Sequence, residues 1–256
     1  MQFQKKIYLL WSNPSGLSWK LIPVIKKIGM LKRHVVRNIR ILLFLKLGMV
    51  EIYQHQSLWD NRQYPRIHRA FAQIWQTEKL WVSLDRANMK PPTRSQNPEW
   101  NNYGMIHWDV DTSQQAIPFG VQGVLYLTDT AENQGEFQCI PGFHHTFYDW
   151  VKSQPVDRNP RVPNLNGLDV KSIAGQAGDL LIWHRLLAHG NGHNASTQPR
   201  LAQYITMSPI NTKLKKIHFY FNKGVQSVSK LGVSVDRPQG GQETLGLGTT
   251  IVKQLN

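Results

Sequence analysis

Between residues 80 and 207 the sequence repeatedly alternates a short apolar run with a turn signal. The runs are "LWVSLDRA" (80–87), "GMIHWDV" (104–110), "VQGVLYLTD" (121–129), "EFQCI" (136–140), "DLLIW" (179–183) and "LAQYITM" (201–207). Segments rich in Pro, Gly and Asn, such as "KPPTRSQNP" and "HGNGHN", separate them. Short runs bounded by turn residues predict β-strands. Many strands with few helices between them favour an antiparallel barrel or sandwich over a doubly wound parallel sheet.

Two helices and one long loop are predicted beside these strands. The first helix begins at Pro65, a residue that suits the first helical turn. Its apolar residues recur at the spacing of one helical face: Ile67, Ala70, Phe71, Ile74 and Trp75. A second, shorter helix is predicted for "HHTFYDWVKS" (144–153). The Pro- and Asn-rich residues 154–169, called the long loop below, are either a surface insertion or a functional segment; we expect them to cover the mouth of the barrel.

The net charge of +14 is concentrated at the two ends of the chain. Residues 1–50 carry +10, residues 51–210 carry −1 and residues 211–256 carry +5. Because the middle is electrically ordinary, no nucleic-acid-reading face is expected in the fold. The chain is therefore divided into a basic N-terminal extension (1–46), a central domain (47–210) and a basic C-terminal extension (211–256). The first extension is either a solvated segment or a membrane-surface helix from Trp19 to Leu47.

Other features of the composition concern the compartment. No apolar run reaches the roughly 18 residues needed to cross a bilayer. The first residues lack the pattern of a secretory signal. Cys139 is the single cysteine, so no intramolecular disulfide can form, and we interpret it as a small buried residue. We expect a cytoplasmic protein with no transmembrane segment and no specific nucleic-acid partner.

The stretch "IHWDVDT" (106–112), called the H-x-D segment below, pairs a histidine with a carboxylate. In an extended segment side chains alternate, so His107 and Asp109 would project to one side and Trp108 to the other. Two ligands of a facial metal site would then come from one strand. The motif is short and weakly specific by itself. For Trp108 and Asp111 we expect packing or supporting roles.

A third ligand is available in "GDLLIWHRLLAHGNGHNASTQPRLAQYITM" (178–207), which contains His184, His189 and His193. His189 is followed, after ten intervening residues, by Arg200 at the head of a predicted strand. This spacing would place both side chains inside one barrel. Two histidines and one carboxylate leave open positions on Fe(II) for a bidentate 2-oxo acid and O2. The planar fork of arginine suits the far carboxylate of such an acid.

The ordered set of motifs resembles the phytanoyl-CoA dioxygenase family of Fe(II)/2-oxoglutarate-dependent oxygenases, from about Gly48 to Pro209. The similarity is clearest in "EIYQHQSLWDNRQYPRIHRAF", "EKLWVSLDRANMKPP", "IHWDVDTS", "FGVQGVLYLTD", "GEFQCIPGFHH" and "GDLLIWHRLLAHGNG…PRLAQYI". It implies a mainly β fold with flanking helices, a double-stranded β-helix (a jelly-roll, cupin-like barrel). No family sequence is recognisable before about residue 46 or after about residue 210, which fits either aberrant chain ends or an added extension.

The resemblance also implies the roles of individual residues. His107, Asp109 and His189 would hold the iron, and Arg200 would anchor 2-oxoglutarate. The amides Asn88 and Asn191 match positions that touch this cosubstrate. Lys90 is a weaker candidate for the same role.

The activity implied is that of a dioxygenase that uses Fe(II), 2-oxoglutarate and O2 to hydroxylate an unactivated C–H bond of a small molecule. Because Asp109 supplies a carboxylate, no ligand position is vacated for halide, and halogenation is disfavoured. Two alternatives stay open. One is a catalytically silent jelly-roll binding protein with aberrant ends, and the other is a polyanion or membrane-surface binder that acts through its basic termini.

Overall fold

Antiparallel sheets dominate the computed structural model, which describes residues 52–93 and 101–210, with 8–10, 48–50, 95 and 254–255. The largest sheet has six strands in the order β1-β8-β5-β10-β4-β2. They are β1 (Tyr8–Leu10), β8 (Leu180–His184), β5 (Val121–Tyr126), β10 (Arg200–Tyr204), β4 (Ala87–Lys90) and β2 (Met49–Val50). A three-stranded sheet joins β7 (Lys171–Ile173), β6 (Phe137–Cys139) and β9 (His189–Asn191), and another joins β11 (Met207–Pro209), β3 (Leu80–Val82) and β12 (Gln254–Leu255).

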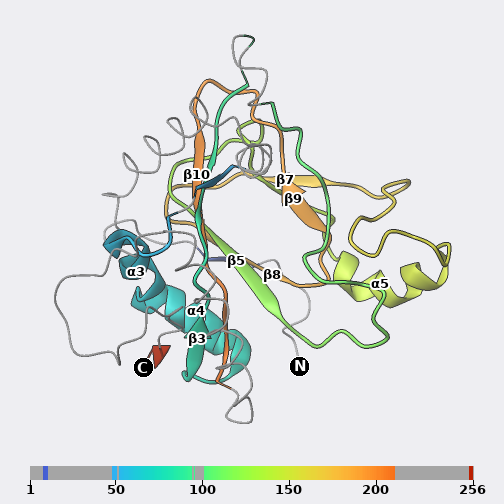
Figure 1. Cartoon of the computed structure of the whole chain (residues 1–256), viewed down its shortest axis with the longest axis horizontal. Coiled ribbons are helices and arrows are strands. Elements are labelled where there is room, and N and C mark those ends of the chain that lie inside the picture. Colours follow the sequence, from blue (N-terminus) through green and yellow to red (C-terminus); the bar gives the residue numbers. More distant parts are fainter. Residues whose placement is uncertain are drawn as a thin grey trace, which may run out of the picture.

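Three helices flank the sheets in the described part of the chain. They are α3 (Gln56–Arg62), α4 (Pro65–Trp75) and α5 (Phe143–Lys152). Figure 1 shows α3 and α4 together on one side of the molecule and α5 on the opposite side. The predictions of α4 and α5 are confirmed, whereas α3 was not predicted. The longest of the three, α4, has 11 residues, and no helix in the described ranges is long and apolar enough to cross a bilayer.

The six-stranded sheet has two apolar faces because successive side chains alternate along each strand. On the outer face Leu125, Ile182 and Leu201 pack in one cluster with Phe71 of α4. On the inner face the neighbouring residues of the same strands pack against Phe137 of β6 in a second cluster. They are Val124, Leu181, Trp183 and Ala202. The rings of Trp183 and Phe137 lie 4.7 Å apart between centroids. Two facing antiparallel sheets that enclose one core form a jelly-roll barrel, as predicted.

The prediction that residues 104–110 form a strand is wrong. Only His107 pairs, through an isolated bridge to His189, and the residues after it bend. The reason lies in the long loop, whose carbonyls accept the amide hydrogens of Trp108 and Thr112 that a strand ladder would otherwise use. The predicted strands 80–87 and 201–207 are each divided in two, into β3 and β4 and into β10 and β11. Residues 189–191, marked by sequence as part of a turn, form β9.

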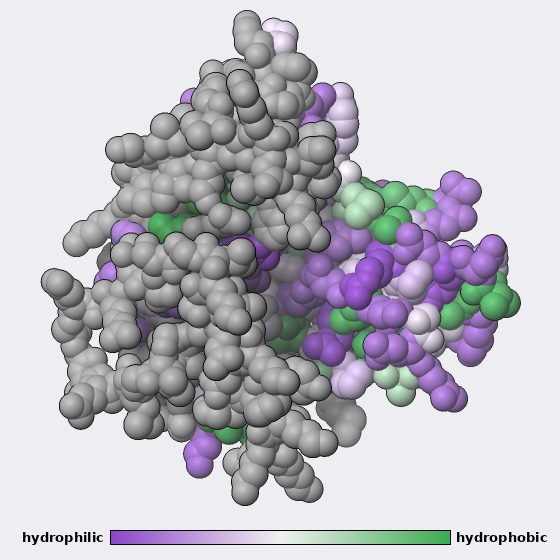
Figure 2. Space-filling view, viewed as in Figure 1, coloured by the Kyte–Doolittle hydropathy of each residue, from purple (hydrophilic) through white to green (hydrophobic). Residues whose placement is uncertain are grey.

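The long loop contains no helix or strand, as predicted. Its outermost apolar side chains, Val156 and Leu165, are exposed. The surface over α5 and its neighbouring loop is mainly hydrophilic with scattered apolar patches (Figure 2). Apart from β1 and β12, the predicted extensions 1–46 and 211–256 lie outside the described residues.

Candidate metal centre

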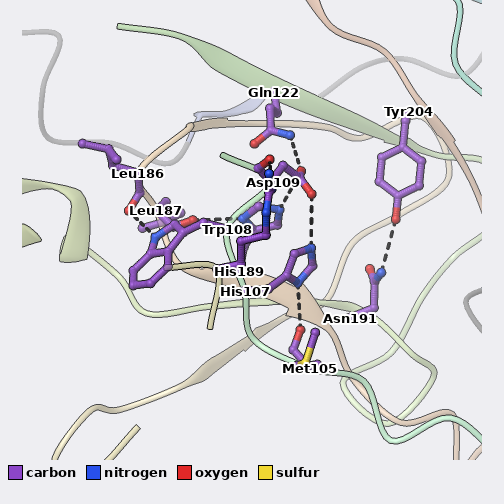
Figure 3. Close-up of polar contacts among 11 residues, drawn as sticks. Met105, His107, Trp108, Asp109, Gln122, Leu186, Leu187, His189, Asn191 and Tyr204 are labelled. Atoms are coloured by element: carbon purple, nitrogen blue, oxygen red, sulfur yellow. Dashed lines mark hydrogen bonds and ion pairs between the residues drawn. The ribbon is translucent and has the colours of Figure 1, made fainter. Parts of the chain in front are cut away.

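His107, Asp109 and His189 come together at one place on the inner side of the barrel (Figure 3). One ligand atom from each residue lies within 4.8 Å of the other two. The Nε2 atom of His107 is 3.3 Å from Oδ1 of Asp109, and that of His189 is 3.6 Å from Oδ2. His189 is buried, His107 is partly exposed and the Asp109 side chain is half exposed. The cluster is therefore closed on the His189 side and open on the Asp109 side.

Backbone carbonyls orient both imidazoles. The Nδ1 atom of His107 lies 3.0 Å from the carbonyl oxygen of Met105, and Nδ1 of His189 lies 2.9 Å from that of Leu187. A carbonyl can only accept, so each Nδ1 carries a proton and each Nε2 faces the cluster. A protonated Nε2 donates to Asp109, and its loss of that proton would leave a lone pair for a metal ion. This is the arrangement that fixes the tautomer of a metal-binding histidine. Two such nitrogens and one carboxylate are the donor set of a facial ferrous-iron site.

The histidines also set the ionisation of the carboxylate. His107 first, and then His189, hold the pKa of Asp109 well below its usual range by hydrogen bonding, against the opposing effect of burial. Burial lowers the pKa of His107, but the hydrogen bonds to Asp109 and Met105 outweigh it and the net shift is upward. The cluster thus keeps a negative charge facing two imidazole nitrogens, which suits a divalent cation.

Three contacts fix the H-x-D segment next to β9. The backbone groups of His107 and His189 exchange two hydrogen bonds, of 2.8 and 3.0 Å. A Cβ atom on Gly190 would overlap the Met105 carbonyl, so glycine permits this close approach. Trp108 points away from the ligand atoms (Figure 3), is 1% exposed and donates from Nε1 to the Leu186 carbonyl at 2.9 Å. Its packing role is the one predicted.

Gln122 is a residue of the site that we did not predict. It lies on β5, and its Nε2 atom donates to Oδ2 of Asp109. Its Oε1 atom is buried and has no hydrogen-bond partner among the described residues. The alternation in "VQGVLY" could have drawn attention to it, because Gln122 falls on the same face as the inward Val124 and Tyr126.

A buried cationic cluster, formed by Arg200 and Lys90, lies on the inner face of β10 and β4. Arg200 is 0% exposed, lies beside Lys90 in register, and its Nη1 donates to Oδ1 of Asn88 at 2.9 Å. Its Nε and Nη2 atoms have no hydrogen-bond partner among the described residues. Burial first, and then the nearby Arg200 charge, lowers the pKa of Lys90 to about 8. Leaving such donors unsatisfied is costly, so the cationic cluster is suited to an anion.

Asn191 lies two residues beyond His189, on the same face of β9. Its Nδ2 atom donates to the Tyr204 hydroxyl at 3.2 Å, which links β9 to the inner face of β10 (Figure 3). Every residue predicted for the site thus falls in the triad, in or beside the cationic cluster or, for Asn191, on β9 with His189.

The other two candidate histidines lie elsewhere. His193 hydrogen-bonds through Nε2 with Thr93 Oγ1 (2.6 Å) and Asn101 Oδ1 (2.9 Å). His184 accepts the amide hydrogen of Leu186 at Nδ1 (3.1 Å) and stacks on His144, with ring centroids 5.1 Å apart. Neither belongs to the metal-binding group found in the described part of the chain.

His184 should make the protein sensitive to acid. Burial first, and then the charges of His144, Arg185 and His145, lower its pKa to about 4. In the unfolded chain this histidine takes up its proton near pH 6.5. The contribution of neutral His184 to the free energy of unfolding is therefore complete above that pH and is lost as the pH falls toward about 4. We expect the melting temperature of the parent to drop more between pH 7 and pH 5 than that of His184→Gln. Equal drops in the two proteins would show that His184 contributes nothing.

The fold and the donor set define a class of protein, a jelly-roll barrel with a facial site of two histidines and one carboxylate. The sequence profile of the family described as phytanoyl-CoA dioxygenase (PhyH) matches residues 47–202. The chain therefore belongs to the phytanoyl-CoA dioxygenase family.

Individual relatives agree with this assignment. A Dictyostelium discoideum protein, provisionally named as a phytanoyl-CoA dioxygenase, is 26% identical over 197 residues, which cover 63% of this chain and 56% of that protein. The ectoine dioxygenase of Bordetella bronchiseptica is 25% identical over 173 residues, 62% of this chain and 55% of that enzyme. The alignments thus span little more than half the length of these curated relatives.

A solved structure has the same fold. The crystal structure of EctD from S. alaskensis with 2-oxoglutarate and 5-hydroxyectoine superimposes with a TM-score of 0.50 and 13% identity, over 81% of this chain and 73% of that one. At this identity the likeness concerns the fold alone, and it supports the jelly-roll architecture.

Proposed function

We propose that this protein is an Fe(II)- and 2-oxoglutarate-dependent oxygenase that hydroxylates a C–H bond of a small molecule. The observation that carries the proposal is the pairing of two features in one barrel. One is a triad whose two Nε2 atoms and one carboxylate converge within 4.8 Å. The other is the buried Arg200 guanidinium, with two nitrogens that lack a partner among the described residues.

In this proposal His107, Asp109 and His189 hold the iron. The carbonyls of Met105 and Leu187 keep both histidines in the metal-binding tautomer, and Gln122 holds the carboxylate. Because Asp109 is half exposed, the open side of the triad is the side that small molecules would approach. The triad leaves open positions for two oxygen atoms of a 2-oxo acid and for O2.

Arg200 binds the far carboxylate of 2-oxoglutarate in the same proposal. Its Nε and Nη2 atoms form one edge of the guanidinium, which suits a bidentate carboxylate. Asn88 holds the remaining nitrogen, Nη1, at 2.9 Å and so orients the plane of the group. Lys90 adds positive charge beside Arg200 while it is protonated. The hydrogen bond from Asn191 to Tyr204 joins the strand of His189 to the strand of Arg200.

When held by His107, Asp109 and His189, iron would supply the oxidising chemistry, in which O2 oxidises 2-oxoglutarate to succinate and CO2 and one oxygen atom of O2 enters the substrate C–H bond. The protein contributes the geometry and the exclusion of bulk water on the closed side of the site. Asp109 would occupy the ligand position that a halide would need, which favours hydroxylation over halogenation.

The test is turnover by purified protein loaded with Fe(II), in the presence of 2-oxoglutarate, O2 and a panel of small molecules. Succinate released in a one-to-one ratio with a hydroxylated product is the expected result. A matched Asp109→Ala protein should release neither. Succinate formation that is equal in the parent and in Asp109→Ala would exclude the proposed site as its source.

A further inference from the structure

The H-x-D segment does not form a strand, and the long loop supplies acceptors for backbone amides that a neighbouring strand would otherwise bind. The amide of Trp108 donates to the carbonyl of Arg161 at 2.9 Å, and the amide of Thr112 donates to the carbonyl of Pro160 at 3.1 Å. The hydroxyl of Thr112 donates to the same Pro160 carbonyl. Thr112 is 3% exposed, so these contacts are shielded from water.

Two arginines of the loop add side-chain contacts to the same segment. Arg158 donates from Nη1 to the Thr112 hydroxyl oxygen (2.8 Å) and from Nη2 to the Thr112 carbonyl (2.6 Å). Arg161 donates from Nη1 to the backbone carbonyl of Asp109 at 2.5 Å. Of the two, only Arg161 bonds directly to a residue of the triad.

We propose that Arg161 is a positioning residue that holds Asp109 in its metal-binding orientation. The inference rests on the proposed function only in taking the triad as a metal site. The carbonyl contact fixes the peptide plane after Asp109, and Gln122 fixes the carboxylate end of the same residue. Asp109 is thus held at both ends although it lies in a bend outside any strand.

An exposed arginine is ordinarily a solvated residue, and Arg161 is itself exposed. Arg161 differs from a solvated arginine because its guanidinium donates to the backbone carbonyl of Asp109. A carbonyl at a bend has no ladder partner, and without Arg161 this carbonyl would bond to water while only the carboxylate end of Asp109 stayed held by protein groups. Residues that orient a metal ligand typically contribute about 10- to 100-fold to metal affinity. The effect of Arg161 should therefore be found in metal affinity and not in overall stability.

The test measures Mn(II) affinity by calorimetry, together with the melting temperature, in the parent and five variants. We expect Arg161→Ala to bind Mn(II) about tenfold more weakly, with Arg161→Lys recovering part of the loss. Arg69→Ala is the matched control, because Arg69 is an exposed arginine on α4, away from the site. Arg158→Ala breaks two bonds to Thr112 without touching Asp109, so it should lose less affinity than Arg161→Ala.

Each other outcome decides against the inference. Mn(II) binding by Arg161→Ala within about twofold of the parent would overturn it, as would a loss in Arg158→Ala that equals or exceeds that in Arg161→Ala. If the loop has only a general structural role, Arg158→Ala should lose at least as much Mn(II) affinity as Arg161→Ala, and partial unfolding would have the same effect. His189→Ala separates the two proposals. If His189→Ala binds Mn(II) like the parent, the proposed metal site is wrong. If His189→Ala loses Mn(II) affinity while Arg161→Ala does not, only the positioning role of Arg161 is wrong.

Discussion

Arg200→Met is expected to weaken 2-oxoglutarate binding on the order of 100-fold or more while Mn(II) affinity changes little. Two guanidinium nitrogens, Nε and Nη2, have no hydrogen-bond partner among the described residues, and in the proposal they bind the acid. Charge-assisted hydrogen bonds are worth about 1.5–3 kcal/mol each, and two of them correspond to this loss in affinity. The measurement is anaerobic calorimetry of 2-oxoglutarate binding to the Mn(II)-loaded protein.

The same substitution should leave the ligand-free protein equally stable or more stable. Replacing a buried and poorly paired cation with an apolar side chain of similar length is often neutral or favourable. Arg62 provides the contrast, because it is also 0% exposed but donates to the carbonyls of Tyr53 (3.0 Å) and Asp85 (2.7 Å). Arg62→Met should lower the melting temperature. If Arg200→Met were the more destabilising of the two, Arg200 would be a structural residue and not an anion anchor.

His189→Ala is expected to lower Mn(II) affinity by about 100-fold or more, since losing a ligand should cost at least as much as losing a residue that orients one. A ring nitrogen of His189 is one of the three ligand atoms that converge, and His107 is the only other histidine of the described residues in the metal-binding group. Metal titration of the apoprotein, followed by calorimetry, measures the loss.

His184→Ala and His193→Ala are the controls for this prediction. Each removes an imidazole from the same stretch of chain without touching the triad. Both should bind Mn(II) like the parent. If His184→Ala lost Mn(II) affinity and His189→Ala did not, the third ligand would be His184, and its assignment to His189 would be wrong.

The architecture was predictable where one periodicity or one local rule decides the structure. The apolar stripe of α4 and its start at Pro65 could be read from spacing alone, and α5 was found within a residue of its bounds. The short apolar run in "DLLIW", bounded by turn residues, likewise predicted β8. In contrast, α3 was missed, because its "QSLWDNR" carries too few apolar residues for a clear stripe.

The candidate site was predictable in membership more than in geometry. The pairing of His107 and Asp109 with His189 was predicted from order along the chain, but the expected strand does not form there. Gln122 and Arg161 were missed because each contacts Asp109 from a distant part of the sequence. Gln122 lies 13 positions from Asp109, and Arg161 lies 52 positions from Asp109. No local period encodes such partners, which are set by how the loop and strands fold over the barrel.

The measurement that tests the central claim most directly is an anaerobic optical titration of the apoprotein with Fe(II) and then 2-oxoglutarate. Chelation of the iron by a 2-oxo acid produces a visible charge-transfer band only when both bind at one centre. We predict that the band forms in the parent, is absent in His189→Ala, and in Arg200→Met needs on the order of 100-fold more 2-oxoglutarate. A parent protein that binds Fe(II) and 2-oxoglutarate without this band, or a His189→Ala protein that shows it unchanged, would contradict the account.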